Sequence, residues 1–397
     1  MTPPLPANAP AKAPATRFLS LDVLRGGTVA LMIGVNNPGS WSQLYPPLAH
    51  AQWHGCTPTD LVFPFFLFAV GNALAFVMPG LQQAPLAQFW GKVVRRTLMI
   101  FGLGLLLNAA PFVRWDADGT LAWKSLESLR IMGVLQRIAL AWMLAALILR
   151  FGGRRRVLYW VAALLLGYWA ACLGFGDGAD PYSLEGWFGT ALDRWLLGPA
   201  HLYRGEGVPF DPEGLASTLP AVAQVLLGYW VGERLARQVP SHEVVAWLFG
   251  AAVLLGLGAY VWQGVMPINK KIWTSSYVLL TTALAMALLG LLVQHLDLRR
   301  RDGAWVRFCQ VFGRNPLFVY VMSGLIPRLD GLLRWTDGVD GQGLPRHLTP
   351  MGWAWQRLFE PLASDARLGS LLFAVANVAA YWALAWWLDR RRIYIRV

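Results

Sequence analysis

Long apolar runs recur along the whole chain, and each is close to the length that crosses a lipid bilayer. A helix needs about 20 mostly apolar residues to span the hydrocarbon core. Ten such runs are present, at residues 20–36, 60–78, 95–113, 131–150, 157–175, 216–233, 244–265, 275–295, 308–326 and 368–388. They predict an all-α, polytopic transmembrane helix bundle with about ten membrane-spanning helices.

Composition supports this class. Of the 397 residues, 56% are apolar and only 14% are charged, and the mean hydropathy is +0.44. Soluble domains carry roughly 25% charged residues, so a soluble fold of this length is excluded. The same numbers exclude an intrinsically disordered chain.

The distribution of charge predicts the orientation in the membrane. The net charge is +12, and the concentrated basic clusters all fall on one side if the N-terminus is cytoplasmic. Such clusters mark cytoplasmic loops. They lie at 92–96, 154–156, 234–237, 299–301 and 390–392. We therefore expect cytoplasmic N- and C-termini, a multi-pass protein of a bacterial inner membrane, and no nucleic-acid partner.

The chain is predicted to form one domain. Residues 1–16 are rich in Pro and Ala and lack the apolar core of a signal peptide, so we expect a disordered cytoplasmic tail. Residues 17–397 are then a single integral-membrane domain, with a short surface helix expected over 351–360. The three cysteines form no CxxC pair and imply no disulfide framework.

The loop after the first run concentrates polar side chains at one membrane face. It holds Asn36, His50 and His54 beside tryptophans such as Trp53, and Asp60 opens the second run. Thr57 and Asp60 have the spacing of a helix capping box, which explains part of the pattern. A neutral imidazole can also accept a proton or carry an acyl group.

We weighed a metal site in this loop and expect none. His50, His54 and Cys56 are close in sequence, but Gly55 and Pro58 argue against one continuous helix. No His/Glu motif elsewhere in the chain would complete a ligand set.

Ionisable groups within apolar runs need a partner or a ligand. Asp22 and Arg25 stand three residues apart, which fits either a mutual ion pair or a seat for an anionic ligand. Gln136 and Arg137 begin the fourth run, where a phosphate or carboxylate partner is plausible.

Two further segments face the same side as His50. The segment PFDPEGL contains Asp211 and Glu213, which fit either helix capping or a clamp on a hydroxyl-rich or cationic substrate. The segment PINKKIWT places Asn269 and Lys270 there, against the charge trend. Positive charge at this face favours an anion or an ion pair with Asp211 or Glu213.

Six sequence blocks of this chain form a characteristic series. RFLSLDVLRGGTVALMIGVNNPG, HAQWHGCTPTDLVFPFFLFAVG, GVLQRIAL, FDPEGLASTLPAV, PINKKIWTSSYVL and GRNPLFVYVMS occur in this order. The chain resembles the transmembrane acyltransferase family related to heparan-alpha-glucosaminide N-acetyltransferase, which has bacterial members. The resemblance implies acetyl transfer from cytoplasmic acetyl-CoA, as co-substrate, to the amine of a glucosamine-type sugar on the periplasmic side.

The resemblance also implies site residues. The histidine of its H-A-x-W-x-G segment is His50, and the asparagine that ends the first helix is Asn36. His50 is then a general base or an acetyl carrier, and Asp60 either orients His50 or binds the sugar. Predicted acceptor contacts are Trp53, His54, Asp211, Glu213, Asn269 and Lys270. Predicted donor contacts are Arg25, Gln136, Arg137 and Asn315. A homodimer is compatible with this class.

Two other functions remain open from the sequence. A polar bundle with carboxylates at one mouth also suits a transporter of an amino sugar or small glycan. An O-acetyltransferase of an envelope polysaccharide would need the same donor.

Overall fold

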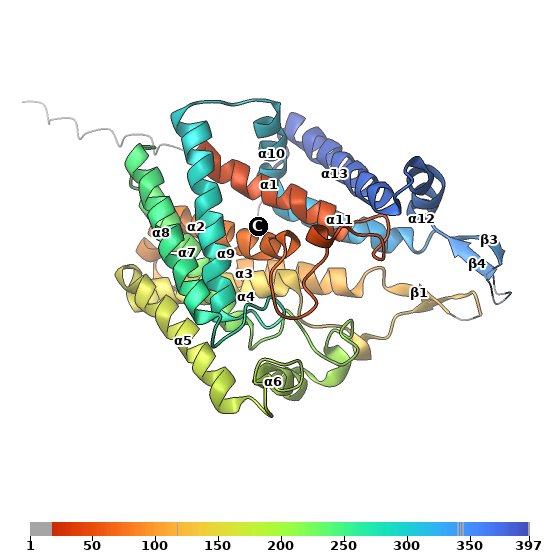
Figure 1. Cartoon of the computed structure of the whole chain (residues 1–397), viewed down its shortest axis with the longest axis horizontal. Helices are drawn as coiled ribbons and strands as arrows, with labels where there is room; N and C mark the ends of the chain where they lie inside the picture. Colours follow the sequence, from red (N-terminus) through yellow and green to blue (C-terminus); the bar gives the residue numbers. More distant parts are fainter. Residues whose placement is uncertain (1–17, 117, 340, 342, 344, 396–397) are drawn as a thin grey trace, which may run out of the picture.

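The chain folds into a helical bundle with two short β-hairpins at one edge (Figure 1). The computed structural model describes residues 18–116, 118–339, 341, 343 and 345–395, so the predicted tail 1–16 lies outside the described residues. The helices are α1 (Leu19–Asn36), α2 (Val62–Gln83), α3 (Leu86–Ala109), α4 (Val134–Leu147), α5 (Val157–Phe175), α6 (Phe188–Leu197), α7 (Thr218–Leu235), α8 (His242–Trp262), α9 (Ser275–Leu292), α10 (Ala304–Arg314), α11 (Pro316–Asp330), α12 (Pro350–Ala354) and α13 (Ala366–Arg390).

Six helical segments are long and apolar enough to cross a membrane. They are Leu19–Asn36, Pro58–Gln83, Val134–Phe175, His242–Trp262, Ser275–Leu298 and Ala366–Arg390. Each of the ten predicted apolar runs contains a helix, but in the described part of the chain only these six meet both criteria. The membrane class is therefore supported, while the number of ten spans and the orientation of the termini stay predictions.

The predicted ninth span is wrong as one continuous helix. The run 308–326 is divided between α10 and α11 at Asn315, whose φ of −129° and ψ of 49° are not helical. Pro316 explains the break, because a proline disfavours the helical conformation of the residue before it and favours a new helix start. The side chain of Asn315 then bonds to Ile393 O at 2.9 Å and to Ile395 N at 2.8 Å.

Glycines allow α2 and α7 to pack backbone to backbone. A Cβ at Gly71 would lie 2.1 Å from the carbonyl oxygen of Val225, and one at Gly228 would lie 2.2 Å from that of Phe68. Close approach at small residues is how helices associate where no water drives them together. Of these two helices, α2 contributes Val62, Phe63 and Phe66 to the wall of the reaction cavity described below.

The start of α1 and the ends of α9 and α10 meet at one end of the bundle, here called the basic end. Asp297 accepts a hydrogen bond from Leu19 N at 2.7 Å, and Arg25 Nε donates to Gly313 O at 3.0 Å. The basic cluster 299–301 lies at this end, since it directly follows Asp297.

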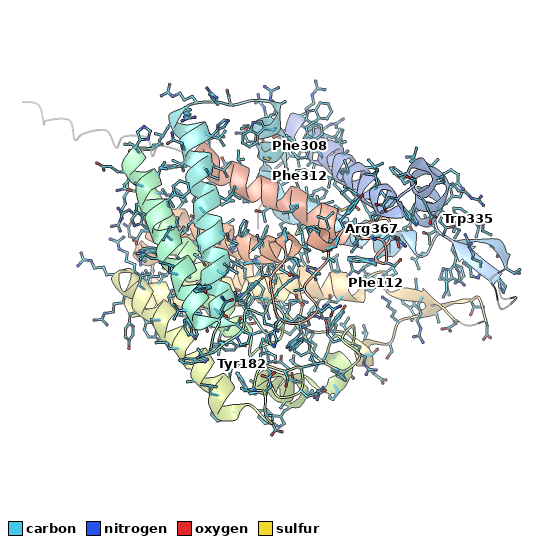
Figure 2. The ribbon with its side chains drawn as sticks, in the orientation of Figure 1. Phe112, Tyr182, Phe308, Phe312, Trp335 and Arg367 are labelled. Atoms are coloured by element: carbon cyan, nitrogen blue, oxygen red, sulfur yellow. The ribbon has the colours of Figure 1, made fainter. Side chains whose placement is uncertain are left out.

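The long loops that follow α1, α5 and α8 meet at the opposite end, here called the loop end. Gly55 N donates to Ile268 O at 2.7 Å, and Trp53 Nε1 donates to Tyr182 O at 2.9 Å. Tyr182 lies near α6 at the lower edge of the view in Figure 2. These contacts bring three loops that are distant in sequence to the mouth of one site.

Apolar packing between helices holds the two ends in place. Phe308 and Phe312 of α10 lie near α1 (Figure 2), with their ring centroids 5.3 Å apart. They share a buried cluster with Val29 and Ile33. The helix α1 is thereby fixed along its length, from the basic end to the loop end.

The two antiparallel hairpins were not predicted. They pair β1 (Val113–Trp115) with β2 (Leu121–Trp123) and β3 (Trp335–Val339) with β4 (Pro345–Leu348), and both lie at the right edge of Figure 1. The guanidinium of Arg334 lies 4.3 Å from the centroid of the Trp115 ring, which links the two hairpin regions. The predicted surface helix at 351–360 is largely present, as α12 and the turns that follow it.

Candidate active site

A histidine and a carboxylate form the centre of the candidate site. His50 Nδ1 lies 2.7 Å from Asp60 Oδ1. The side chain of His50 is 41% exposed, whereas that of Asp60 is 1% exposed. If Nδ1 donates to the carboxylate, the lone pair of Nε2 is left free to accept a proton. The pair is therefore arranged as a general base, His50, whose ring is oriented by the buried carboxylate of Asp60.

Local sequence explains why Asp60 is fixed. Pro58 begins a short 3-10 helix that leads into α2, and the predicted capping box is present. Asp60 Oδ2 accepts hydrogen bonds from Thr57 N at 3.0 Å, Thr57 Oγ1 at 3.0 Å and Ala51 N at 3.1 Å. A carboxylate with this many donors is held in one orientation, so the structural and catalytic interpretations of Asp60 are compatible.

Lys270 completes the group. Its Nζ lies 3.0 Å from His50 Nδ1, 3.4 Å from His50 Nε2 and 3.4 Å from Asp60 Oδ1. Burial lowers the pKa of the Lys270 ammonium below its usual value, although the charge of Asp60 opposes that effect. The lysine comes from the loop after α8, where Trp273 has a φ of 53°. Such a conformation is uncommon for a side-chain-bearing residue.

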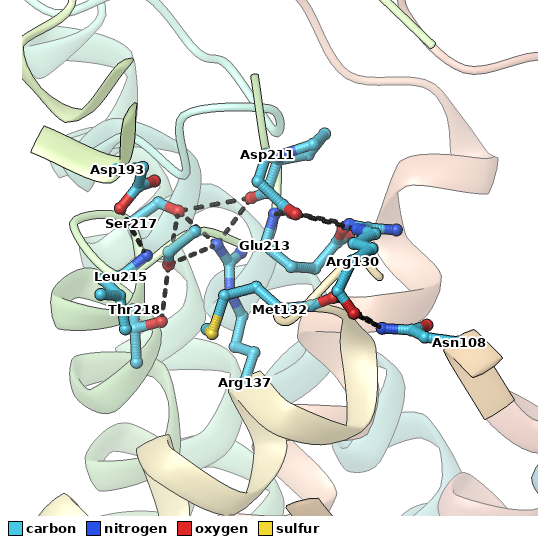
Figure 3. A network of polar contacts seen from close by, with 12 residues as sticks. Asn108, Arg130, Met132, Arg137, Asp193, Asp211, Glu213, Leu215, Ser217 and Thr218 are labelled. Atoms are coloured by element: carbon cyan, nitrogen blue, oxygen red, sulfur yellow. Dashed lines mark hydrogen bonds and ion pairs between the residues drawn. The ribbon is translucent and has the colours of Figure 1, made fainter. Parts of the chain in front are cut away.

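The acidic segment at 211–213 is held by an arginine that the sequence analysis missed (Figure 3). Arg130 bonds to Asp211 through Nε at 2.8 Å and Nη2 at 2.6 Å, and to Glu213 Oε2 at 2.6 Å. Burial would raise the pKa of Glu213, but Arg130 and Arg137 hold it below its usual value. Glu213 is therefore an ionised carboxylate beside the site.

Arg137 supports this segment from below. Its side chain is fully buried, and Nη2 donates to Pro212 O at 2.6 Å and to Ser217 Oγ. The guanidinium lies 5.0 Å from the ring centroid of Trp273. In Figure 3 it lies beneath the turn that carries Glu213. Arg137 thus links the acidic segment to the loop of Lys270.

Asp193 is a buried carboxyl next to the same turn. Its Oδ1 accepts from Leu215 N at 3.0 Å, and its Oδ2 has no partner among the described residues. Burial raises the pKa of Asp193 to about 7. A carboxyl with this pKa is partly protonated at neutral pH.

Asp193→Asn is expected to remove a pH dependence of stability. Because the pKa of Asp193 is higher in the folded protein, folding favours the protonated carboxyl. The stability that this protonation gives is fully present below about pH 4 and is lost as the pH rises through 7. The variant should therefore gain stability over the wild type by roughly 4 kcal/mol at pH 8 but by only about 1.5 kcal/mol at pH 5. Thermal unfolding in detergent at both pH values measures this. The exposed Asp302→Asn is the control, and an equal gain at both pH values would contradict the expectation.

A cavity of about 150 Å³ lies at the His50 side, here called the reaction cavity. It is lined by Met32, Val35, Asn36, His50, Thr59, Val62, Phe63, Phe66, Val134, Leu135, Ile138, Glu213, Lys270, Leu317 and Tyr320. Its polar groups are the imidazole of His50, the amide of Asn36, the carboxylate of Glu213, the ammonium of Lys270, and the hydroxyls of Thr59 and Tyr320. An apolar cavity with a few convergent polar groups is the usual form of a small-molecule site.

A larger cavity of about 650 Å³ adjoins it on the basic side, here called the basic cavity. It shares Phe66, Leu135, Ile138 and Leu317 with the reaction cavity. Its lining includes three arginines, which are Arg25, Arg96 and Arg314. The predicted ion pair of Arg25 with Asp22 is present at 2.9 Å. Three arginine side chains therefore line the cavity that adjoins the one holding His50.

Not every predicted residue lines these two cavities. Trp53 packs on Phe210 and bonds to Tyr182, and His54 lies 3.4 Å from Asn269. Asp211, Arg137, Asn269 and Asn315 are buried in contacts within the protein. Gln136, predicted at the donor, lines a separate cavity with Asn36. The roles assigned to these residues stay predictions.

Three contributors were overlooked in the sequence. Arg130 stands just before the fourth run, so it was not counted among the buried charges. Arg96 belongs to a basic cluster assigned only to orientation, yet it lines the basic cavity and lies 4.6 Å from the ring centroid of Trp142. Tyr320 follows Pro316 by one turn and lines the reaction cavity. Of these three residues, only Arg96 could have been recognised from the sequence, because its charge falls inside an apolar run.

The three residues considered as metal ligands, His50, His54 and Cys56, have other interactions in the structure. Burial raises the pKa of the Cys56 thiol to about 12, so it is protonated at neutral pH. His50 and His54 bond to different partners. Among the described residues, no group of three His, Cys, Asp or Glu side chains is placed to hold a metal ion.

The match with known proteins covers the part of the site that runs from Arg25 to Glu213. The family model described as heparan-alpha-glucosaminide N-acetyltransferase, catalytic, matches residues 17–248, more than half of the chain. The heparan-alpha-glucosaminide N-acetyltransferase of Mus musculus is 27% identical over 365 residues, covering 78% of this chain and 54% of that protein. That of Homo sapiens is 27% identical over 359 residues, covering 77% and 52%.

The chain thus spans about half the length of the curated relatives it matches. The resemblance found in the sequence blocks is confirmed by these matches. With its long apolar helices, the protein is a membrane protein that belongs to the acyltransferase family of the heparan-alpha-glucosaminide N-acetyltransferase catalytic domain.

Proposed function

We propose that this protein transfers an acetyl group from acetyl-CoA to the amine of a glucosamine-type sugar across a bacterial cytoplasmic membrane. One observation carries the proposal: the arginine-lined basic cavity adjoins the reaction cavity that holds His50. A polyanionic donor would keep its phosphates near Arg25, Arg96 and Arg314 and direct its thioester toward His50. The acceptor would enter from the loop end.

His50 is the general base of the proposed reaction. A sugar ammonium must lose a proton before its nitrogen can attack a thioester, and Nε2 of His50 is available when Nδ1 bonds to Asp60. The imidazolium that results is stabilised by the Asp60 carboxylate, which is buried beside it. Direct transfer needs no covalent enzyme intermediate, whereas an acetyl-histidine would require a second step.

The bonds balance in one transfer. The sugar ammonium first loses one proton, through His50, to solvent. The neutral amine nitrogen then bonds to the carbonyl carbon of the thioester, His50 takes a second proton from this nitrogen, and that proton passes to the thiolate that leaves as the carbon–sulfur bond breaks. Asn36 ends α1 at the wall of the reaction cavity, where its amide can donate to the carbonyl oxygen that becomes negative. Glu213 supplies the negative charge that would bind the sugar ammonium before it is deprotonated.

The direct test uses the purified full chain in detergent with acetyl-CoA and glucosamine. Mass spectrometry of the product should show an amide on the sugar nitrogen. An ester would instead favour the O-acetyltransferase, and uptake of glucosamine into vesicles without acetyl-CoA would favour a transporter. Rapid-quench digestion that finds no acetyl group on His50 would support direct transfer.

Arg96→Gln is expected to weaken the binding of acetyl-CoA and to leave the binding of the acceptor sugar largely unchanged. Loss of one charged contact to a phosphate is worth about 1.5–3 kcal/mol, so the KM for acetyl-CoA should rise roughly 10- to 100-fold. The KM for the acceptor should change much less. Steady-state kinetics with each substrate varied in turn measures this difference.

Arg95→Gln is the matched control for Arg96→Gln. Arg95 is the preceding residue of α3 and is exposed, while Arg96 lines the basic cavity. An equal rise of the KM for acetyl-CoA in both variants would mean that general surface charge, and not the basic cavity, attracts the donor.

A further inference from the structure

Two neighbouring lysines in the loop after α8 have different surroundings. Lys271 Nζ lies 2.6 Å from Glu206 Oε2, in a close ion pair that joins two loops. Lys270 Nζ is 3.4 Å from Asp60 Oδ1, and its shortest hydrogen-bond contact in the described part of the chain is to His50 Nδ1, at 3.0 Å. Lys270 is therefore placed against the proposed base, and no step of the proposed reaction uses it.

Lys270 also reaches the nitrogen of His50 that takes part in the chemistry. Its Nζ lies 3.4 Å from Nε2, and both side chains line the reaction cavity. Partners in proton transfer lie about 2.6–3.2 Å apart during the reaction, and such contacts are often longer when no substrate is bound. A proton on Nε2 is thus one short step from the lysine.

The turn that carries Lys270 is rigid, whereas its side chain can move. Asn269 is fully buried, its N donates to Thr274 Oγ1 at 3.0 Å, and its Oδ1 accepts from Ile272 N at 3.1 Å. These bonds hold the backbone on both sides of Lys270. The lysine side chain has a flexible four-carbon stem, so Nζ can turn from the imidazole toward the middle of the cavity.

The surroundings of Lys270 also suit the release of a proton. Burial lowers the pKa of the Lys270 ammonium, and the charges of Asp60 and Glu213 oppose this effect. An ordinary lysine has a pKa of about 10.4 and an ordinary thiol one of about 8.5. The lowered pKa brings the ammonium closer to the thiol, and a proton moves more readily between groups of similar pKa.

The leaving group of the proposed reaction needs a proton donor. The thiolate of an aliphatic thiol is basic, so its departure is easier when it is protonated as the carbon–sulfur bond breaks. At that moment Nε2 of His50 holds the proton of the amine, while Nδ1 is bonded to Asp60. The amine nitrogen and the sulfur occupy different corners of the reacting carbon. A second group beside the imidazole can serve the sulfur without any turn of the ring.

We propose that Lys270 is the general acid that protonates the departing thiolate. The carbon–sulfur bond breaks with its electron pair on sulfur, and the Lys270 ammonium gives that sulfur one proton. His50 takes one proton from the amine nitrogen and passes it to the neutral Lys270 amine, so both residues return to their starting states. This inference rests on the proposed function and adds a catalytic residue to it.

The test compares two donors that differ in the basicity of the leaving thiolate. The full chain in detergent is given glucosamine with acetyl-pantetheine, or with S-(4-nitrophenyl) thioacetate, whose thiolate is a weak base and leaves without a proton. In Lys270→Gln, kcat/KM for acetyl-pantetheine should fall by about 100- to 10,000-fold, and that for the nitrophenyl donor by less than about tenfold. His50→Ala should lose activity with both donors, because the amine must still be deprotonated.

Two further variants separate proton transfer from charge. Lys270→Arg keeps the positive charge, but a guanidinium does not give up its proton in proteins. It should therefore lose acetyl transfer from acetyl-pantetheine as Lys270→Gln does and be rescued by the nitrophenyl donor. Lys271→Gln is the matched control, since it breaks the partly exposed ion pair with Glu206. It should stay within about threefold of the wild type with both donors.

Each outcome decides the inference. An equal loss with both donors in Lys270→Gln overturns it, as does wild-type transfer from acetyl-pantetheine in Lys270→Arg, which would mean that only the charge matters. An equal loss in Lys271→Gln overturns it as well. If thermal unfolding shows that Lys270→Gln does not fold, the same comparison of donors in Lys270→Arg decides. Failure of the wild type to acetylate glucosamine from any donor, acetyl-CoA included, would instead contradict the proposed function.

Discussion

His50→Ala is expected to lower kcat for acetyl transfer by about 100- to 10,000-fold, the contribution typical of a positioned general base. The structure gives the reason, because His50 is the imidazole that both lines the reaction cavity and contacts the buried carboxylate of Asp60. The KM for acetyl-CoA should change little, since the arginines of the basic cavity are untouched. Steady-state kinetics of the purified variant measures both constants.

His54→Ala is the informative comparison for His50→Ala. Sequence alone placed both histidines in one loop, but His54 contacts Asn269 and does not line the reaction cavity. The fold-decrease of kcat in His54→Ala should be at least ten times smaller than that in His50→Ala. A similar loss in both variants would mean that the loop as a whole is needed, and the assignment of the base to His50 would be wrong.

Arg130→Met is expected to destabilise the fold by about 3–5 kcal/mol, because removal of one partner leaves buried charges uncompensated. The side chain of Asp211 is fully buried and that of Glu213 is 15% exposed, and both bond to Arg130. Burial would favour loss of the Arg130 proton, but these two carboxylates hold its pKa above the usual value. Methionine keeps the apolar stem and removes only the charge and its hydrogen bonds.

Thermal unfolding in detergent measures the effect of Arg130→Met. Arg237→Met is the control, because it breaks an exposed ion pair with Glu233, which is worth only about 0.3–0.5 kcal/mol. Arg130→Lys should lie between the wild type and Arg130→Met, since it keeps the charge but loses the fork geometry. Equal melting temperatures for Arg130→Met and Arg237→Met would contradict the structural role given to Arg130.

The helices were predictable because each apolar run carries its own signal. The runs 157–175 and 275–295 coincide with α5 and with α9 and its final turn, since apolar residues at spanning length need no partner to be recognised. The break at Asn315 was also encoded locally, by the proline that follows it. The two hairpins were not predictable, because their strands are three to five residues long and their side chains alternate only once or twice.

The candidate site was predicted unevenly for a similar reason. His50 and Asp60 are ten residues apart, and the capping box fixed the orientation of Asp60 within a short segment. Lys270 lies 220 residues from His50, so sequence indicated only that both face the same side. The position of Arg137 beneath the acidic segment depends on how α4 packs on α7.

The order of apolar runs and basic clusters determined by itself that this is a helical membrane protein, because hydrocarbon imposes a length and a polarity on every segment that crosses it. The sequence blocks also determined its family. Only the tertiary structure decided which polar side chains share a cavity. Helix packing sets those contacts between residues hundreds of positions apart, and no local pattern records them.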